Sequence, residues 1–282
     1  MILGSAGMLG HMVYNYLNET NNFRIIDTSY PVKANQNSYL LNVTDKLAVE
    51  KYISTEKPDV VINCIGILIK GSQSDPSNAI YLNSYFPHNL SKLLRETGGR
   101  LIHISTDCVF SGKNGEYAET DFRDANDTYG RSKALGEVNN DFDLTLRTSI
   151  IGPELKENGE GLFHWFMQQK GEINGYTEAY WGGVTTLELA KAIEMAIEQN
   201  ITGLAHLTNG NKISKYNLLT LLKEIWGKDY ITIRPYNGKS VDKTLLKSTN
   251  FTYEVPTYKQ MIIDLYEWTL ENKHIYSKLY KR

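Results

Sequence analysis

A tyrosine and a lysine four residues apart are the first pair in this sequence whose types and spacing could do chemistry. The run Tyr129–Lys133 has the pattern Y-x-x-x-K, and the i,i+4 spacing in a helix places both side chains on one face. At an effective dielectric of about 20, a lysine charge roughly 6 Å from the phenol favours the phenolate by about 3 kcal/mol, on the order of two pKa units. The pair therefore predicts that Tyr129 is a general acid near neutral pH. The alternative is a helix with a solvated lysine and a half-buried tyrosine.

A hydroxyl group is expected close to that pair. The run Ser105–Phe110 follows a predicted strand, Arg100–Ser105, so Thr106 lies at the carboxyl end of that strand. Ligands of an open parallel sheet bind beyond the carboxyl ends of its strands. We therefore expect Thr106 to hydrogen-bond a carbonyl group in a cleft at this edge.

Three glycines near the start could hold a phosphate group. Gly4, Gly7 and Gly10 form G-x-x-G-x-x-G ahead of an amphipathic helical pattern, a place where glycine lets the backbone approach a pyrophosphate at a helix N-terminus. The same spacing also occurs in plain strand-to-helix turns. Only residues 1–3 precede the turn, fewer than an ordinary strand has, which suggests a clipped start.

The residues after the second predicted strand bear on the choice of coenzyme. Asp27 is expected at the end of that strand, where an acidic side chain would bind ribose hydroxyls and favour NAD. Thr28, Ser29 and Lys33 could instead receive a 2′-phosphate, and an aspartate there is often only a turn former. The sequence leaves NADPH and NADH open.

Short β-branched runs that alternate with helical patterns supply the scaffold, and this alternation is typical of a parallel sheet covered by helices. The predicted strands are Phe23–Ile26, Tyr39–Val43, Val60–Ile67, Arg100–Ser105 and Leu144–Arg147. The predicted helices between them are Met8–Leu17, Leu47–Ile53, Ile80–Arg95 and Tyr129–Val138. Pro87 should kink or restart the third helix.

The order of these elements predicts a Rossmann-type α/β fold, an open doubly wound parallel sheet, as an NAD(P)-binding domain over residues 1–152. After that the chain becomes richer in aromatic residues and glycine. We expect residues 153–282 to form a smaller C-terminal substrate-binding lobe, packed against the first domain or interleaved with it. Its predicted helices are Leu162–Gln169, Leu187–Gln199, Lys215–Trp226 and Tyr258–Asn272.

The composition excludes several classes of protein. The 282 residues are 41% apolar and 22% charged with a net charge of −2, which argues against general disorder and against a purely electrostatic nucleic-acid binder. No run of eighteen apolar residues and no secretion signal is visible, so we expect no membrane partner and a cytoplasmic location. The two cysteines and six scattered histidines predict neither a disulfide framework nor a metal site.

Several motifs taken together resemble the extended short-chain dehydrogenase/reductase family, most closely its branch of dTDP-4-dehydrorhamnose reductases. That branch has the pattern S-T-D-x-V-F-x-G followed by Y-G-x-S-K-x-x-G-E, found here as Ser105–Gly112 and Tyr129–Glu137. The resemblance covers most of the chain. Further matches are Asn42–Asp45, Pro58–Asn63, Arg147–Ser149 and Arg234–Asn237.

The resemblance implies a reductase that passes hydride from NADPH or NADH to C4 of a dTDP- or UDP-linked 4-keto-6-deoxyhexose, for surface polysaccharide precursors. Thr106 would hold the carbonyl oxygen, Tyr129 would protonate the new alkoxide, and Lys133 would bind the nicotinamide ribose and keep the pKa of Tyr129 low. Residues expected to contact the coenzyme are Gly4, Gly7, Met8, Leu9, Gly10, Asp27, Asn42, Val43, Cys64, Ile65, Gly66, Tyr129 and Lys133. Residues expected to contact the substrate are Thr106, Cys108, Val109, Phe110 and Tyr129. A monomer or a homodimer is expected.

Cys108 occupies the variable position of the first motif, where reductases of this branch usually carry tyrosine and dehydratases carry glutamate. The missing glutamate argues against dehydration. A cysteine at this place also resembles the GDP-fucose synthase branch, which implies an epimerase/reductase in which Cys108 removes a proton and His164 is the partner acid. The plainer interpretation of His164 is a histidine on a helix face. Cys64 is interpreted as a small buried residue on a strand.

Two further alternatives stay open at this point. Arg123, Lys113 and Arg131 could bind a diphosphate, although ordinary solvated charges are the simpler interpretation, and Asn42 replaces an aspartate common in the relatives. Some relatives keep the fold and act as NADP-binding regulatory subunits, as in methionine adenosyltransferase. The presence of all three predicted catalytic residues disfavours that role here.

Overall fold

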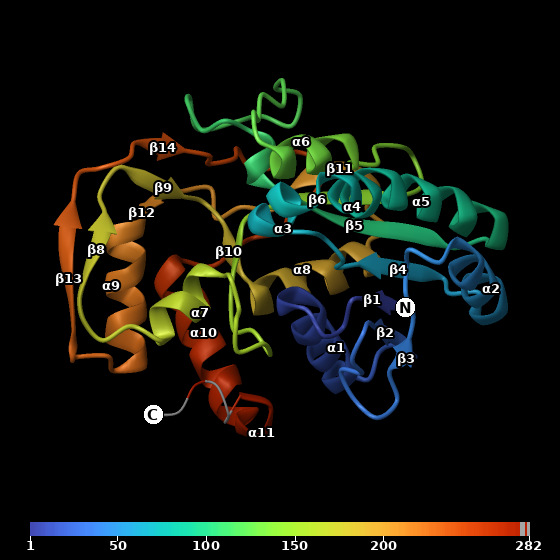
Figure 1. Ribbon diagram of the computed structural model, residues 1–282, viewed down its shortest axis with the longest axis horizontal. Coiled ribbons are helices and arrows are strands. Elements are labelled where there is room, and N and C mark those ends of the chain that lie inside the picture. The colour runs from blue at the N-terminus through green and yellow to red at the C-terminus, as the bar shows by residue number, and fades with distance from the viewer. Residues whose placement is uncertain (277–279, 281–282) are drawn as a thin grey trace.

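The computed structural model describes residues 1–276 and 280. Its main layer is a seven-stranded parallel sheet in the order β11-β6-β5-β4-β1-β2-β3, which runs across the right of Figure 1. The strands are β1 (Ile2–Leu3), β2 (Asp27–Ser29), β3 (Tyr39–Leu40), β4 (Val60–Asn63), β5 (Arg100–Thr106), β6 (Leu144–Thr148) and β11 (Gly203–His206). The strand order reverses at β1, as in a dinucleotide-binding sheet, which confirms the predicted fold class.

Helices cover both faces of this sheet because successive strand residues point to opposite sides. Ile62 packs into the cluster that includes α1 (Met8–Thr20) and α8 (Thr186–Glu198), whereas Val61 packs into the cluster with α2 (Lys46–Glu56) and α5 (Phe86–Thr97). The second face also carries α3 (Ile69–Ser74), α4 (Pro76–Ile80), a π-helical turn (Tyr81–Tyr85) and α6 (Thr128–Leu135). The near-continuous apolar strands of a doubly covered parallel sheet explain the β-branched runs of the first half.

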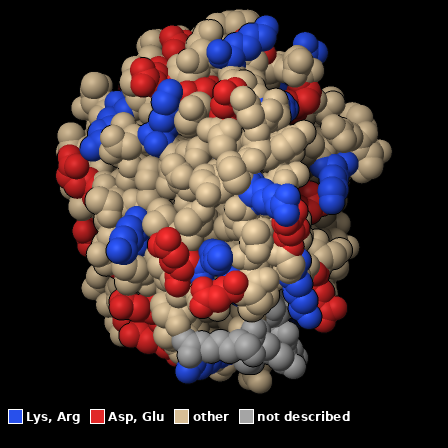
Figure 2. All heavy atoms as spheres, turned by 90° about the vertical axis from the view of Figure 1, so that its left-hand side faces the viewer, with Lys and Arg blue, Asp and Glu red and all other residues tan. Residues whose placement is uncertain are grey.

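The remaining elements form the smaller part of the molecule at the left of Figure 1. They are β7 (Ile150–Ile151), α7 (Leu162–Met167), β8 (Gly171–Tyr176), β9 (Ala179–Trp181), β10 (Val184–Thr185), β12 (Ile213–Ser214), α9 (Lys215–Trp226), β13 (Ile231–Tyr236), β14 (Val241–Asp242), α10 (Tyr258–Glu271) and α11 (Lys273–Tyr276). On the face drawn in Figure 2, positive and negative side chains are interspersed around uncharged surface. Among the residues that the structure describes, no helix is long and apolar enough to span a bilayer.

The chain beyond residue 152 returns to the first sheet before it completes the second part. Strand β11 pairs with β6 at the sheet edge, and α8 packs on α1. One apolar cluster contains Ile62 of the sheet together with Leu218 of α9 and Leu265 of α10. The division into residues 1–152 and 153–282 stays a prediction, with the two parts interleaved and joined by a shared core.

Several predicted boundaries are wrong. The second strand is Asp27–Ser29 instead of Phe23–Ile26, because its register is set by β1, where Ile2 pairs with Asp27. The predicted helix Ile80–Arg95 is divided by the π-helical turn, and α5 restarts at Phe86 with Pro87 in its first turn, where a missing N–H costs nothing. The helix predicted to reach Val138 ends at Leu135.

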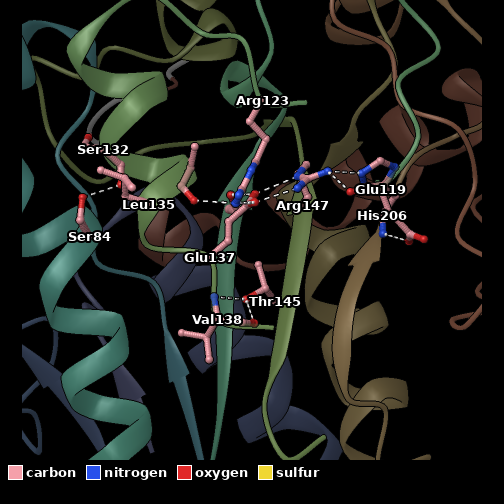
Figure 3. Close-up of polar contacts among 12 residues, drawn as sticks. Ser84, Glu119, Arg123, Ser132, Leu135, Glu137, Val138, Thr145, Arg147 and His206 are labelled. Carbon is pink, nitrogen blue, oxygen red and sulfur yellow. Dashed lines mark hydrogen bonds and ion pairs between the residues drawn. The ribbon is translucent and has the colours of Figure 1, made fainter. Parts of the chain in front are cut away.

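A buried ion pair joins the carboxyl ends of three strands (Figure 3). Glu137, just after α6, binds Arg147 of β6 through two contacts, Nε to Oε1 at 2.8 Å and Nη2 to Oε2 at 2.7 Å, and both side chains are 1% exposed. Ser105 of β5 donates to Glu137 Oε1 at 2.7 Å. On its far side Arg147 Nη1 contacts His206 Nε2 of β11 at 2.8 Å. The pair thus fixes the edge of the sheet at which Thr106 ends β5.

Replacing Arg147 with methionine should lower the free energy of unfolding by about 3–5 kcal/mol, because it leaves the buried Glu137 carboxylate without its main partner. Urea unfolding followed by circular dichroism measures the change. The matched control is Arg234→Met, which removes an ion pair with Glu172 whose side chains are 66% and 49% exposed; we expect a loss of about 1 kcal/mol or less. Equal losses in the two variants would contradict the structural role of the buried pair.

Candidate active site

The glycine turn between β1 and α1 is shaped by close backbone contacts. Gly4 has φ +85°, and a Cβ there would lie 2.9 Å from the Ile65 side chain. A Cβ on Gly10 would lie 2.1 Å from the Gly4 carbonyl oxygen. Gly7, the residue before the helix, provides no side-chain cap. The first N–H groups of α1, at Met8 and Leu9, are therefore left for an anion such as a pyrophosphate, and the turn fits a dinucleotide.

The segment after β4 lies directly beside this turn. Cys64 N–H donates to the Leu3 carbonyl at 3.1 Å, and Ile65 packs on Gly4. Because β1 and β4 are neighbours at the point where the strand order reverses, Cys64, Ile65 and Gly66 border the predicted coenzyme crevice. The contact of these three residues with a coenzyme stays a prediction.

Asp27 is buried, and its carboxylate is bound by other side chains of the protein. Its carboxylate accepts hydrogen bonds from Ser5 Oγ at 2.5 Å, Ser38 Oγ at 2.6 Å and Asn35 Nδ2 at 3.3 Å, and the residue is 5% exposed. It begins β2, so the prediction that it ends this strand is wrong. The carboxylate joins the glycine turn, through Ser5, to the loop after β2. Of the alternative residues, Lys33 is exposed and donates to a backbone carbonyl at 3.3 Å.

Asn42 and Val43, predicted to contact adenine, follow β3. Asn42 Oδ1 accepts from the backbone N–H of Thr44 at 3.1 Å and from its hydroxyl at 2.8 Å. Val43 is buried, and its carbonyl accepts from Tyr81 Oη at 3.3 Å. Both residues therefore hold the turn that leads into α2, and their role toward adenine stays a prediction.

The three predicted catalytic residues come together at the end of β5. Helix α6 begins after Asp127, whose side chain accepts from Gly130 N–H at 2.9 Å, so Tyr129 and Lys133 occupy its first two turns. Thr106 lies close enough to the Tyr129 phenol for its side chain to lower the pKa of that group. Lys133 Nζ donates to the Ile104 carbonyl at 2.7 Å, two residues before Thr106. A Cβ on Gly130 would lie 2.3 Å from the Cys108 carbonyl oxygen, so this glycine lets α6 approach the loop that follows β5.

Burial changes the proton affinity of these groups in opposite directions. It raises the pKa of Tyr129, and the neighbouring Cys108 and Asp107 raise it further. Burial lowers the pKa of Lys133 to about 8. The expected low pKa of Tyr129 is therefore wrong, because desolvation of the phenolate outweighs any favourable charge. The phenol keeps its proton at neutral pH, as a proton donor must.

Asp107 and Lys243 belong to this cluster, although the sequence reasoning gave them no role. Burial raises the pKa of Asp107, and the charge of Lys243 together with the polar side chains of Thr106, Ser149 and Cys108 opposes this rise. Thr106 Oγ1 donates to Asp107 Oδ1 at 3.1 Å. Asp107 could have been found, since it lies inside the S-T-D motif. Lys243 is separated from it by more than a hundred residues, and no spacing pattern connects the two.

Cys108 and His164 are not a hydrogen-bonded pair. Burial and the adjacent Asp107 raise the pKa of the Cys108 thiol to about 12. His164 is buried in α7, where Nδ1 contacts Tyr280 Oη at 2.9 Å and Nε2 contacts Gln168 Nε2 at 2.7 Å. Both ring nitrogens thus have partners within the C-terminal part of the chain, as expected of a helix-face histidine.

The other residues proposed near the substrate have structural contacts. Val109 and Phe110 are fully buried in a small cluster in which Phe110 stacks on Tyr117, with ring centroids 4.2 Å apart. Arg123 Nη1 donates to Glu137 at 2.9 Å, and Arg131 Nε donates to the Ala125 carbonyl at 3.2 Å, while Lys113 is exposed. These contacts support the loop between β5 and α6.

A Rossmann-type sheet, a glycine turn and a Thr-Tyr-Lys cluster define a dinucleotide-dependent oxidoreductase. The family described as RmlD substrate binding domain matches residues 1–280, so the chain belongs to this family. Membership confirms the predicted class, an NAD(P)H-dependent oxidoreductase of the extended short-chain dehydrogenase/reductase type, and supports a reductase of sugar nucleotides.

Individual relatives are similar to this chain over most of their length. The chain is 26% identical to a dTDP-4-keto-6-deoxy-D-glucose reductase of Streptomyces niveus over 245 residues, 83% of this chain and 81% of that one. It is 25% identical to methionine adenosyltransferase 2 subunit beta of Xenopus laevis, over 86% of this chain and 77% of that one. The crystal structure of a dTDP-4-dehydrorhamnose reductase from Bacillus anthracis in complex with NADP has a TM-score of 0.78 at 20% identity, covering 95% and 98% of the two chains. At that identity the third comparison shows the fold alone.

Changing Gly10 to alanine should weaken NAD(P)H binding by about tenfold or more, because the added Cβ collides with the Gly4 carbonyl oxygen and displaces the turn. Fluorescence titration of the reduced coenzyme measures the Kd. Asn18→Ala, at an exposed position of the same helix, is the control and should bind like the wild type. Wild-type affinity in Gly10→Ala would exclude this turn as the pyrophosphate site.

Proposed function

We propose that this protein reduces the 4-keto group of a nucleotide-activated 4-keto-6-deoxyhexose, linked to dTDP or UDP, with NADPH or NADH. The observation that carries the proposal is the meeting of Thr106, Tyr129 and Lys133 at the carboxyl end of β5, an edge of the sheet that also carries the glycine turn. The Streptomyces niveus relative, named as a reductase of such a sugar, supports the substrate class. A role in precursors of surface polysaccharide follows from the resemblance to dTDP-4-dehydrorhamnose reductases.

The chain's own residues suit an acid-assisted reduction. A bound reduced nicotinamide supplies the hydride. Tyr129 holds a proton on Oη because burial raises its pKa, and it gives this proton to the oxygen that becomes the C4 hydroxyl. Thr106 binds the same oxygen while it is still a carbonyl and keeps it within reach of the phenol. Lys133, held at Ile104, lies on the same side of α6 and stabilises the phenolate left after proton transfer.

Tyr129→Phe should lower kcat by about a hundredfold or more, because it removes the general acid. The Kd of the coenzyme should change by less than about twofold, since the phenol does not form the phosphate turn. Loss of reduced-nicotinamide absorbance with dTDP- and UDP-linked 4-keto sugars measures turnover. Tyr85→Phe, at a tyrosine that is 47% exposed, is the control. Near-wild-type turnover of Tyr129→Phe would remove this residue from the mechanism.

A regulatory role is the second candidate, favoured by the similarity to methionine adenosyltransferase 2 subunit beta. The two functions separate in the same assay. Reduction of any 4-keto sugar nucleotide supports the enzyme, whereas coenzyme binding without turnover across the whole panel favours the regulatory subunit. Mass spectrometry and NMR of the product would identify the sugar and its configuration at C4.

The thiol of Cys108 should react slowly with iodoacetamide at pH 8. With a pKa of about 12, about one molecule in ten thousand carries a thiolate at that pH, and the thiolate is the reactive form. Mass spectrometry of the folded and the urea-unfolded protein gives the two rates, and the unfolded chain is the control. Rapid labelling of folded Cys108, or exchange of the sugar's C3 or C5 hydrogen with deuterated water, would instead favour the epimerase/reductase.

A further inference from the structure

Two buried polar side chains, Asn63 on β4 and His103 on β5, form a chain of hydrogen bonds that leads to Lys133. Asn63 is the last residue of β4 and His103 lies opposite it on β5 as its register partner. Both are 0% exposed. Apolar residues are the rule in a strand covered on both faces, so a buried amide and imidazole side by side need a reason. The hydrogen bonds of these two side chains lead to Lys133 and to the segment after β4.

The hydrogen bonds fix the tautomer of His103. The backbone N–H of Ile65 donates to Asn63 Oδ1 at 3.1 Å, which orients the amide so that its Nδ2 faces the ring. Asn63 Nδ2 then donates to His103 Nδ1 at 3.2 Å. A neutral imidazole has one acceptor nitrogen and one N–H. Because Nδ1 accepts, the hydrogen of the ring is on Nε2.

That N–H points at the lysine. His103 Nε2 lies 3.3 Å from Lys133 Nζ, and the same Nζ donates to the Ile104 carbonyl at 2.7 Å. An ammonium group has only donors, so it would present a hydrogen to a nitrogen that already carries one. A neutral amine has a lone pair that accepts from Nε2–H and still keeps two hydrogens, one of them for the carbonyl. The neutral amine is therefore the form that satisfies every group.

We propose that His103, oriented by Asn63, is a positioning residue of the reductase site that holds the Lys133 amine against β5 and favours its neutral form. The inference deepens the proposed function, on which it rests for the role of the lysine in catalysis. It assigns a purpose to two fully buried polar residues on neighbouring strands of the sheet. A lysine held in this way is ready to take up or release a proton within the pH range of the cell.

The charged and titratable neighbours of this pair come from every element packed around it. Glu137 after α6 and Cys64 after β4 favour the ammonium form of Lys133. Burial has the larger, opposite effect and lowers the pKa of Lys133 to about 8. His88 on α5 faces His103. Burial, followed by the charges of Lys133 and His88, holds the pKa of His103 well below its ordinary range, so the ring stays neutral through the pH range in which the lysine titrates.

The first test is the tautomer of His103 in the wild-type protein, without substrate or coenzyme. NMR of protein labelled with ¹⁵N-histidine distinguishes the two neutral tautomers and the imidazolium, and the His103 signals are the ones lost in His103→Gln. We expect Nε2 protonated and Nδ1 unprotonated between pH 6 and 9. An Nδ1–H tautomer, or a ring that becomes charged in this range, would overturn the proposal.

The second test is the pKa of Lys133, from NMR titration of ¹³C-lysine. Glutamine at position 103 offers a carbonyl oxygen that accepts from an ammonium, so His103→Gln should raise the pKa of Lys133 by about one unit, a tenfold gain in proton affinity. Asn63→Leu frees Nδ1 to take the hydrogen and should shift it in the same direction, which provides a second variant if His103→Gln does not fold. His164→Gln, at a buried histidine on α7, is the matched control and should leave this pKa unchanged.

In the active enzyme the same variants should move the pH profile. Lys133 stabilises the phenolate as an ammonium, so kcat/KM falls as the pH rises through the pKa of the lysine, and His103→Gln should move this fall upward by about one pH unit. A uniform loss of rate with an unmoved profile would show a merely structural histidine and contradict the proposal. The two NMR measurements need no turnover. An inactive wild-type protein would therefore count against the proposed function only. The tautomer of His103 and the pKa of Lys133 would still decide this inference.

Discussion

A buried ion pair between Arg147 and Glu137 holds together the edge of the sheet on which the candidate site is built. Its contacts of 2.7 and 2.8 Å lie between side chains almost free of solvent, so each charge depends on the other. Glu137 also accepts from Ser105, the residue directly before Thr106. Glu137 also follows Lys133 by four residues, about one helical turn. The Glu137 carboxylate thus contacts the end of β5 and lies just after the end of α6. In this way it helps to position the Thr106 hydroxyl and the Lys133 amine.

The ion pair also explains how a short helix suffices at this site. Helix α6 has eight residues, and isolated helices of that length are unstable in water. The helix is stabilised at its start by Asp127 and after its end by Glu137, and it packs on the loop after β5 through Gly130. Tertiary contacts at both ends of α6 therefore hold Tyr129 and Lys133 in place, more than the helix's own propensity does.

Desolvation is the dominant electrostatic effect throughout the candidate site. It raises the pKa of Tyr129, Asp107 and Cys108, and lowers the pKa of Lys133 and His103. In each case the neutral form is favoured. Desolvation keeps the proton on the Tyr129 phenol and lowers the pKa of Lys133 to about 8, so the lysine titrates just above neutral pH. The polar contacts with Asn63, Ile104 and Thr106 then decide where each hydrogen points.

The sequence by itself determined the class of fold, the glycine turn and the side chains that are proposed to react. Periodicity fixes strands and helices because burial of an apolar face is a local pattern, and the motifs that contain Thr106, Tyr129 and Lys133 are contiguous. The tertiary structure decided the strand register that places Asp27 inside the fold, the approach of Lys243 to Asp107, and the hydrogen-bond chain from Asn63 to Lys133. It also decided the direction of the Tyr129 pKa. Spacing along a helix gives the distance from Tyr129 to one charge, that of Lys133. The proton affinity of the phenol also depends on how much water the neighbouring elements exclude. Only the packed molecule defines this exclusion.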